Sequence, residues 1–542
     1  MAKNKKTTQT PNKKVPYNLP KGSLVRVNLG QSFAEYDLTL NHPYAFVETP
    51  AIKAAMSENI SKCFYIGRRG TGKTATTFFL SSKFEKNSIS ILPQLFSAIE
   101  VPFTSDELRD TRQRPFKSLV TCFKRALLDE VLLQWTLNGS IKKDRLSGNL
   151  SKEKNYFENF DFDLRMLTFS EEIFEAYHNR NQREWLRLIN RPKEIAQEMD
   201  EWRTNKTYDF YLLIDRIDES WDGSDKSVIL LMALMHACVE LANPAPFVRP
   251  LLFLRENIFE RVRQIDNEFA RLETFVISVD WSRNLLLEFI ERRFNIHFTA
   301  KLPLGGETWD YFFESLEGES SRHMVFDYCQ ERPRDVLTYC SFALESAQQD
   351  KHETIKIEDL QSAKRRFSDS RLKDLGDEYQ ENYPQIQLIL ALFYGLGTEY
   401  TINGITAFIK RLLIDDEVRQ HCATWIYDYT PPDRFTQLLF NIGFFGIKEA
   451  DNVTYRSLGA QSPIPPPISN NTHFIIHPSY AEALNLREIL IDKIDLSLPL
   501  KMAGLLSDIP EAINLAQFQT HLTELIENIK TLPKLDFVHF EK

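Results

Sequence analysis

A loop with the pattern G-x-x-x-x-G-K-[ST] constrains this chain more than any other feature. It reads "GRRGTGKT" from Gly67 to Thr74, in a sequence of 542 residues that contains only 19 glycines. An apolar run at 63–66 precedes the loop and a segment with helical character follows it, which predicts a strand–loop–helix unit. Glycines let backbone N–H groups converge on a phosphate chain, and the helix N-terminus adds partial positive charge. The sequence therefore predicts a nucleotide-binding loop.

Two side chains at the end of this loop have the chemistry that a bound nucleotide requires. Lys73 offers a mobile positive charge to the β- and γ-phosphates of ATP, and the hydroxyl of Thr74 is suited to Mg²⁺. The expected cofactors are therefore ATP and Mg²⁺. The residues predicted to bind the nucleotide are Gly67, Gly70, Thr71, Gly72, Lys73, Thr74 and Ala75.

A carboxylate at the end of another apolar run is expected to complete the metal site. The segment "FYLLIDRIDES" places five apolar residues before Asp215, and Asp218 and Glu219 follow shortly after. Open parallel sheets keep their chemistry at the carboxyl ends of the strands. We therefore assign Asp215, together with Thr74, to Mg²⁺, either as a direct ligand or through water.

The order of apolar runs and helical segments predicts an α/β protein with further helical parts. Strands are expected at 63–66, 89–91, 210–214, 250–254 and 275–279, and their alternation with helices favours a parallel sheet covered on both faces. Helices at 384–396, 402–413 and 432–441, followed by strands at 444–447, 453–458 and 473–477, are typical of a winged helix. We expect a disordered basic tail (1–22), a P-loop core (23–280, with a helical insertion at about 137–207), an all-α lid (281–380), a winged-helix domain (381–490) and a helical tail (491–542).

Composition and charge indicate the cellular compartment and the classes of partner that are expected for this chain. The net charge is -9, which does not favour nucleic-acid or anionic-membrane binding by the chain as a whole. The six cysteines have no metal-binding spacing, no secretory signal is present, and the longest apolar run (228–241) is too short to span a bilayer. A reduced cytoplasmic protein with no membrane contact is the expectation.

Several motifs together resemble the AAA+ and STAND ATPases, and more closely those with the architecture of origin-recognition ATPases. The resemblance covers about residues 40–490. In "LLFLREN", Arg255 lies where sensor 1 of the family reads the γ-phosphate, and "DWSRNLLLEFIERRF" resembles the entry to the lid. "ERPRDVL" is similar to a sensor-2 helix, in which Arg334, or less favourably Arg332, reaches back to the nucleotide. "GRRGTGKTA" with "DRIDESWDG" also resembles a group of bacterial ATPases associated with mobile-element and phage-defence loci.

The chain departs from the family pattern at one position that matters for hydrolysis. The metal-binding Asp is usually followed by a Glu that orients the attacking water, but Arg216 occupies that position here. Asp218 or Glu219 could supply the base instead. Arg216 is either a surface charge or an arginine finger, acting in cis or towards a neighbouring subunit of a homo-oligomer. His477 is either a packed residue or, as in some STAND proteins, a contact to the diphosphate.

The winged helix carries too few basic residues to bind DNA by itself. Its second-helix segment offers Arg434 and its wing offers Arg456, whereas non-specific DNA binding rests on several phosphate contacts. A protein-docking or nucleotide-capping role is favoured. The better candidate for a polyanion-binding surface lies in the insertion, where four arginines have the spacing of one helical face: Arg180, Arg183, Arg187 and Arg191. This face is either simply solvated or a surface for a partner protein or a nucleic acid.

Three functional hypotheses follow from these patterns. The first is a slowly hydrolysing ATPase that acts as a nucleotide-operated switch or assembly factor for a partner effector in bacterial antiphage defence. The second is a DNA-associated loader or motor. The third is a nucleotide-binding scaffold without hydrolysis. No nuclease, protease or transferase motif occurs, so effector chemistry is expected in another polypeptide.

Overall fold

The computed structural model describes residues 23–57, 62–93, 99, 105–137, 148–202, 210–315, 320–449, 452–456 and 472–493. The expected basic tail (1–22) and the proline-rich segment at 462–471 lie outside these residues, as does nearly all of the expected helical tail. Among the described residues, no helix has the length and apolar character needed to cross a membrane.

The core is a sheet of five parallel strands in the order β2-β3-β4-β1-β5. The strands are β1 (Phe64–Gly67), β2 (Ser88–Ile91), β3 (Phe210–Ile214), β4 (Val248–Arg255) and β5 (Val276–Ser278). Strands β1 and β3 are buried along their whole length, as continuous apolar runs in a doubly covered parallel sheet should be. The predicted α/β class with a P-loop core is confirmed.

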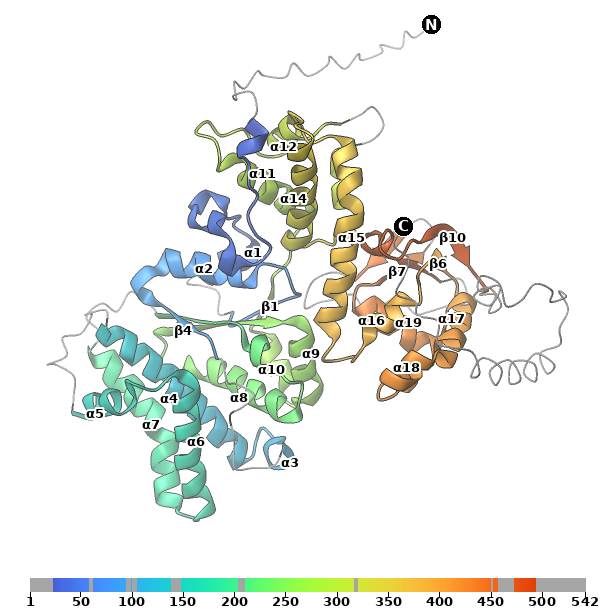
Figure 1. Cartoon of the computed structure of the whole chain (residues 1–542). Coiled ribbons are helices and arrows are strands. Elements are labelled where there is room, and N and C mark those ends of the chain that lie inside the picture. The colour runs from blue at the N-terminus through green and yellow to red at the C-terminus, as the bar shows by residue number, and fades with distance from the viewer. Residues whose placement is uncertain are drawn as a thin grey trace, which may run out of the picture.

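Side chains alternate between the two faces of this sheet, and each face has its own apolar cluster. Phe64 and Ile66 join a cluster with α4 (Arg114–Leu137), α8 (Asp225–Leu241) and α9 (Glu256–Ile265). Tyr65 points the other way and packs with α1 (Pro50–Met56) and α2 (Lys73–Phe84). Figure 1 shows α1 and α2 on one side of the sheet and α4 and α8 on the other. Short helices complete the core: α3 (Ser105–Leu108) and α10 (Phe269–Glu273).

The insertion is a group of helices that packs against α4. It contains α5 (Gly148–Phe157), α6 (Phe162–His178) and α7 (Gln182–Trp202), which project from the core in Figure 1. Trp185 of α7 is buried and its indole N–H donates to the hydroxyl of Ser118 in α4 at 3.0 Å. The apolar face of α7 therefore docks on the core.

The lid is built from helices, and the N-terminal segment of the chain packs against it. Its helices are α11 (Arg283–Asn295), α12 (Glu307–Phe312), α13 (Ser321–Phe326), α14 (Pro333–Gln349) and α15 (Ile357–Tyr379). Leu24, Val27 and Leu29 are buried in the lid cluster. Arg293 of α11 forms a buried ion pair with Asp37 at 2.7 Å. The segment 23–57, with the 3-10 turns η1 (Ser23–Arg26), η2 (Ala34–Tyr36), η3 (Leu38–Asn41) and η4 (Pro43–Ala45), thus connects lid and core.

The last described part is a winged helix that lies beside α15 and the core (Figure 1). Its helices are α16 (Ile386–Ala391), α17 (Ile402–Ile414), α18 (Asp416–His421) and α19 (Pro432–Asn441). Its strands follow the order β10-β6-β9-β7-β8, with β6 (Gly397–Tyr400), β7 (Phe445–Glu449), β8 (Asn452–Tyr455), β9 (His473–Ile476) and β10 (Arg487–Ile491).

Two details of the winged helix differ from the sequence expectation. The first helix ends at Ala391, not at Leu396, and strand β6 follows it. Residues up to Ile491, where the helical tail was expected to begin, form strand β10. Both strands are short. Strand β10 pairs in parallel with β6, and Arg487 lies opposite Gly397 although 90 residues separate the two. Such pairing depends on tertiary contacts and has no local sequence signal.

Candidate nucleotide-binding site

The glycine-rich loop joins β1 to α2 in the geometry that a phosphate-binding loop needs. Gly70 and Gly72 have φ values of 86° and 88°, in the left-handed region that glycine adopts without strain. Gly72 is the N-cap of α2, so the first free N–H groups of the helix face the loop. A Cβ atom at Gly70 would lie 2.9 Å from the Cβ of Arg334. The lack of a side chain at this glycine therefore also lets Arg334 of the lid pack against the loop.

Lys73 and the predicted metal ligands lie together beneath this loop. The buried ammonium of Lys73 donates to the carbonyls of Gly67 at 2.8 Å and Arg68 at 3.0 Å. Burial lowers the pKa of Lys73 to about 8, although the Asp218 carboxylate opposes this shift. Burial also raises the pKa of Asp215, and a hydrogen bond from the side chain of Thr74 counteracts it. Asp215 thus lies against the first turns of α2, where the hydroxyl of Thr77 donates to it at 3.5 Å and Thr74 lines the same cavity.

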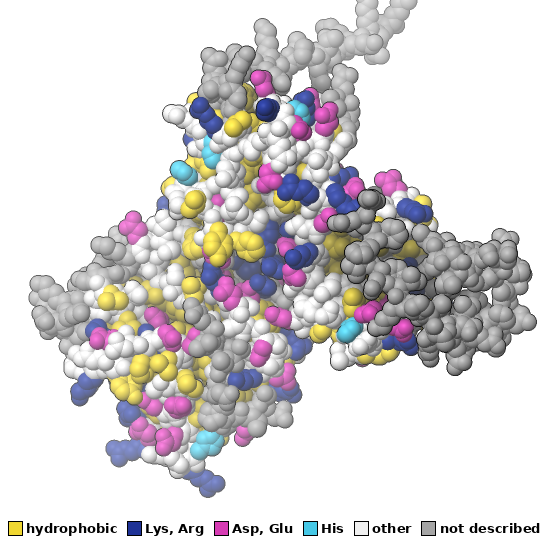
Figure 2. Space-filling view, in the orientation of Figure 1, with side chains coloured by type: hydrophobic (Ala, Val, Ile, Leu, Met, Phe, Trp, Pro, Cys, Tyr) yellow, Lys and Arg dark blue, Asp and Glu magenta, His cyan; other side chains and the backbone are white. Residues whose placement is uncertain are grey.

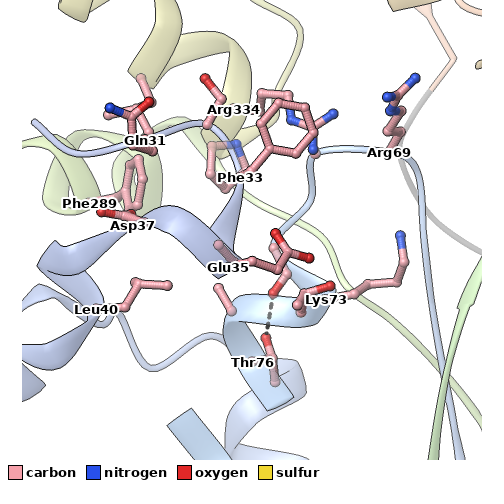
Figure 3. A pocket seen from close by; sticks show the side chains of 18 of the residues that line it. Gln31, Phe33, Glu35, Asp37, Leu40, Arg69, Lys73, Thr76, Phe289 and Arg334 are labelled. Carbon is pink, nitrogen blue, oxygen red and sulfur yellow. Dashed lines mark hydrogen bonds between the residues drawn. The ribbon is translucent and has the colours of Figure 1, made fainter. Parts of the chain in front are cut away.

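A cavity of about 220 Å³ opens over the loop, between the core, the lid and the N-terminal segment. In Figure 3, Phe289 and Leu40 lie on one side of this cavity, and Lys73 and Arg69 lie on the other. Figure 2 shows basic side chains gathered on this face of the molecule between the lid and the sheet, with hydrophobic ones beside them. An apolar end and a basic end fit the two ends of a nucleotide. The basic residues of the lining are Arg69, Lys73, Arg216, Arg255, Arg293 and Arg334.

The two candidate bases, Asp218 and Glu219, have different surroundings in the turn η8 (Ile217–Ser220). The Asp218 side chain is 16% exposed and forms an ion pair with Arg255 at the end of β4. The Glu219 side chain is 60% exposed and lies 3.5 Å from Arg216. Both residues line the cavity, but Asp218 is the one held by the sheet.

The sequence left Arg216 as either a surface charge or an arginine finger, and in the structure its side chain is 25% exposed. It has a positive φ of 64°, lines the cavity, and lies 2.5 Å from a carboxylate oxygen of Glu35. Its Nε lies towards Glu219. Both sides of the guanidinium therefore face carboxylates, one of them from the N-terminal segment.

The structure separates the roles of the two arginines at the start of α14. Arg334 lines the cavity, its backbone N–H donates to the carbonyl of Gly70 at 3.3 Å, and its guanidinium lies 5.0 Å from the ring of Phe33. Among the described residues it has no ion-pair partner, and its Nε is buried without a hydrogen bond. Burial, together with the nearby charge of Arg69, lowers the pKa of Arg334 to about 10.

Arg332 instead has a structural environment away from the cavity. Its side chain pairs with Asp335 and with Glu378, in each case at 3.3 Å. It also donates to the backbone carbonyl of Arg69 at 3.2 Å. Arg334 is therefore the arginine that faces the candidate site, which agrees with the preference drawn from the sequence.

The sequence analysis did not assign several residues of the cavity lining to the site, among them Phe33, Glu35, Arg69 and Trp281. The indole N–H of Trp281 donates to the carbonyl of Thr71 at 2.8 Å, so the lid entry touches the loop directly. Its place in the lid-entry motif could have indicated this contact. Phe33 and Glu35 carry no motif, and only the folded chain brings them to the site.

His477 lies outside this cavity. It is buried, it accepts a hydrogen bond from the backbone N–H of Ser479 at 3.1 Å, and its ring packs 4.5 Å from that of Tyr455. Burial lowers the pKa of His477 to about 3, so the ring is neutral. The structure supports the packed role for His477.

The arginines of the insertion do not form one basic stripe. Helix α7 begins at Gln182, so Arg180 precedes it, in a turn with a φ of 54°. The expectation of four arginines along one helical face is therefore wrong for this residue, because the helix starts later than the periodicity suggested. Arg187 pairs with Glu184 at 2.6 Å, and Arg191 pairs with Glu153 at 2.9 Å. Arg183 is exposed.

In the winged helix, the two arginines that the sequence analysis considered for DNA contact are engaged. Arg456 pairs with Glu256 at 2.5 Å, and Arg434 donates to the backbone carbonyl of Asp428 at 3.3 Å. The first contact joins the wing to helix α9 of the core. These contacts support docking within the chain more than phosphate binding.

Comparisons with known proteins give four findings. Residues 284–376 match the family model of the FunZ-associated C-terminal helical domain. The transposon gamma-delta 80.3 kDa protein of Escherichia coli strain K12 is 26% identical over 475 residues, covering 82% of this chain and 65% of that protein. This chain therefore spans slightly less than two thirds of that relative.

The other two findings concern a shorter relative and a solved structure. Allergen Alt a 2 of Alternaria alternata is 31% identical over 152 residues, covering 28% of this chain and 80% of the allergen. A chain of the structure described as Drosophila ORC bound to DNA aligns with a TM-score of 0.30 and 12% identity, covering 88% of this chain and 95% of that one.

Proposed function

We propose that this chain, which belongs to the same protein family as Allergen Alt a 2, binds ATP with Mg²⁺ and acts as a slow nucleotide-operated switch. The observation that carries the proposal is the unsatisfied charge of Arg334. A half-buried cation with a lowered pKa, a buried Nε without a hydrogen bond and no ion-pair partner among the described residues is costly, and an anion in the cavity would reduce that cost. Arg334 lies against Gly70 of the phosphate loop, where phosphates are expected.

Each part of the nucleotide has residues suited to it. The loop N–H groups, Lys73 and Arg334 would hold the phosphates, and the apolar side of the cavity would receive the base. Thr74 and Asp215 would hold Mg²⁺, which supplies neutralising charge at the β- and γ-phosphates. Asp218 is the preferred group for orienting the attacking water, because Arg255 fixes its position.

The switch part of the proposal rests on where the lid and winged helix meet the loop. Trp281 contacts Thr71, and the buried side chain of Arg68 donates to the carbonyl of Ile442 in the winged helix at 2.7 Å. A ligand that changes the loop would thereby change these contacts. We propose a partner protein as the target, in keeping with the resemblance to ATPases of phage-defence loci, because Arg187, Arg191 and Arg456 are each held in an ion pair.

Replacement of Lys73 by Ala tests nucleotide binding. Titration of a fluorescent ATP analogue with Mg²⁺ should show affinity reduced at least about tenfold, since a charge-assisted contact to phosphate is lost. Lys83→Ala, an exposed position in the same helix α2, is the matched control and should bind as the unaltered chain does. Equal affinity of the Lys73 variant, or no binding by the unaltered chain, would refute the proposal.

A further inference from the structure

Arg216 forms an ion pair with a carboxylate of the N-terminal segment. Arg216 follows Asp215 directly, at the carboxyl end of β3, yet its closest carboxylate belongs to Glu35 in η2, at 2.5 Å. The two side chains are 25% and 28% exposed, so the pair lies at the mouth of the cavity and not in the core. An ion pair with this exposure is weak and exchanges readily for a better partner.

The N-terminal segment around Glu35 also covers the second arginine of the site. Residues 31–35 belong to the cavity lining, and Phe33 lies over Arg334 with 5.0 Å between guanidinium carbon and ring centre. In Figure 3, Glu35 lies between Phe33 and the first turn of α2. Two residues of one short segment therefore contact the two arginines that flank the phosphate loop on the core side and on the lid side.

The place of Arg216 relative to a nucleotide follows from its neighbour. The carboxylate after β3 serves the metal that bridges the β- and γ-phosphates in proteins with this loop. Arg216 follows this carboxylate directly and lines the same cavity as Asp215 and Lys73, so its guanidinium is near enough to serve a terminal phosphate bound there. A guanidinium there can form a bidentate contact with phosphate, whereas a diphosphate offers nothing at that position.

We infer that Glu35 and Arg216 form a triphosphate-sensing pair, in which Arg216 exchanges Glu35 for the terminal phosphate of ATP. This inference rests on the proposed function, because it assigns the pair to the same nucleotide site. Glu35 is then a specificity-determining residue: it holds the arginine when no terminal phosphate is present and competes with that phosphate when it is. The exchange also releases the N-terminal segment from the end of β3.

Calorimetric titration of the full chain with Mg-ATP and Mg-ADP separates the roles of the two residues. Arg216→Gln should weaken ATP binding by about tenfold and leave ADP binding unchanged, since only the terminal phosphate loses a charged donor. Glu35→Gln should tighten ATP binding several-fold without affecting ADP, because it removes the competitor. The double variant should behave like Arg216→Gln alone.

A control and two contradicting outcomes make the test decisive. Glu48→Gln, an exposed residue of the same N-terminal segment, should change neither affinity. If Arg216→Gln leaves the ratio of ATP to ADP affinity unchanged, or if Glu35→Gln shifts both affinities equally, the inference is wrong. If the unaltered chain binds neither nucleotide, the proposed function and this inference both fail; if it binds ATP and ADP normally, the variants test the inference alone.

Discussion

Glu378, near the end of α15, accepts a hydrogen bond from the backbone N–H of Arg69 in the phosphate loop at 3.3 Å, although 309 positions separate the two residues. Its other carboxylate oxygen pairs with Arg332, which donates in turn to the carbonyl of Arg69. The ion pair between Glu378 and Arg332 thus forms hydrogen bonds with both the N–H and the carbonyl group of Arg69. Because binding couplings are reciprocal, whatever stabilises this loop conformation also stabilises the contact between the loop and the lid.

Glu378→Gln should destabilise the protein in a pH-dependent way. Burial alone would raise the pKa of Glu378, but the charges of Arg68 and Arg332 outweigh it and lower the pKa to about 2. Since the folded pKa is below the unfolded one, this stabilisation is present above about pH 4.5 and disappears as the pH falls towards 2. The shift corresponds to about 3 kcal/mol of unfolding free energy.

Denaturant unfolding at several pH values measures this effect. The difference between the unaltered chain and Glu378→Gln should be largest near neutral pH and shrink below pH 4.5, while Glu358→Gln, exposed on the same helix, should change little at any pH. A difference that does not depend on pH would show that the charge of Glu378 contributes nothing.

Arg334 and Arg332 should respond in opposite ways to replacement by Ala. Arg334→Ala should lower ATP affinity by about tenfold with little loss of stability, because this cation has no ion-pair partner among the described residues. Arg332→Ala removes one of two arginine partners from each of the buried carboxylates Glu378 and Asp335, and should cost on the order of 3 kcal/mol of stability. Thermal melts with and without ATP distinguish the two effects, and the reverse pattern would contradict the assignment.

Asp218 and Glu219 should differ in their effect on turnover. Asp218→Asn should reduce kcat by about a hundredfold or more if this carboxylate orients the attacking water. Glu219→Gln should retain nearly full activity, because its side chain is 60% exposed and is not fixed by the sheet. Phosphate release under single-turnover conditions, with nucleotide affinity measured in parallel, checks both. Loss of turnover only in the Glu219 variant would reverse the assignment.

ATP binding should become weaker between pH 7 and pH 9. Burial lowers the pKa of Lys73 to about 8, so the free protein loses this charge in that range, whereas bound phosphate favours the protonated form. Affinity should fall by about tenfold at pH 9, with proton uptake on binding. Calorimetry in two buffers of different ionisation enthalpy measures the uptake. In Lys73→Arg the side chain stays charged, so its affinity should not show this pH dependence.

Duplex DNA should not stimulate ATP turnover at moderate salt. The ion pairs of Arg187 and Arg191 within the insertion, and of Arg456 at the wing, offset the positive charges that phosphate contacts would need. Turnover assays with and without DNA check this, with Arg183→Glu combined with Arg187→Glu as the charge-reversed comparison. A several-fold rise in turnover that this double variant abolishes would favour a DNA-loading role.

Patterns within contiguous residues were enough to predict the core of this fold. The spacing of Gly67, Lys73 and Thr74 predicts the phosphate loop, and apolar runs predict all five strands of the sheet, because both depend on a few neighbouring residues. Asp215 could be placed beside Thr74 for the same reason, since parallel strands deliver their carboxyl ends to one edge. The helical lid follows from periodicity alone.

The partners of the charged residues depend on tertiary structure. Nothing near Arg216 in the sequence indicates Glu35, and nothing near Arg69 indicates Glu378, because each pair joins segments that meet only after the sheet, the lid and the N-terminal segment have packed. The same holds for the choice between Arg332 and Arg334, which are two residues apart but face different surroundings. Local pattern specifies which chemical groups are available, and packing of distant segments decides which of them stay free to meet a ligand.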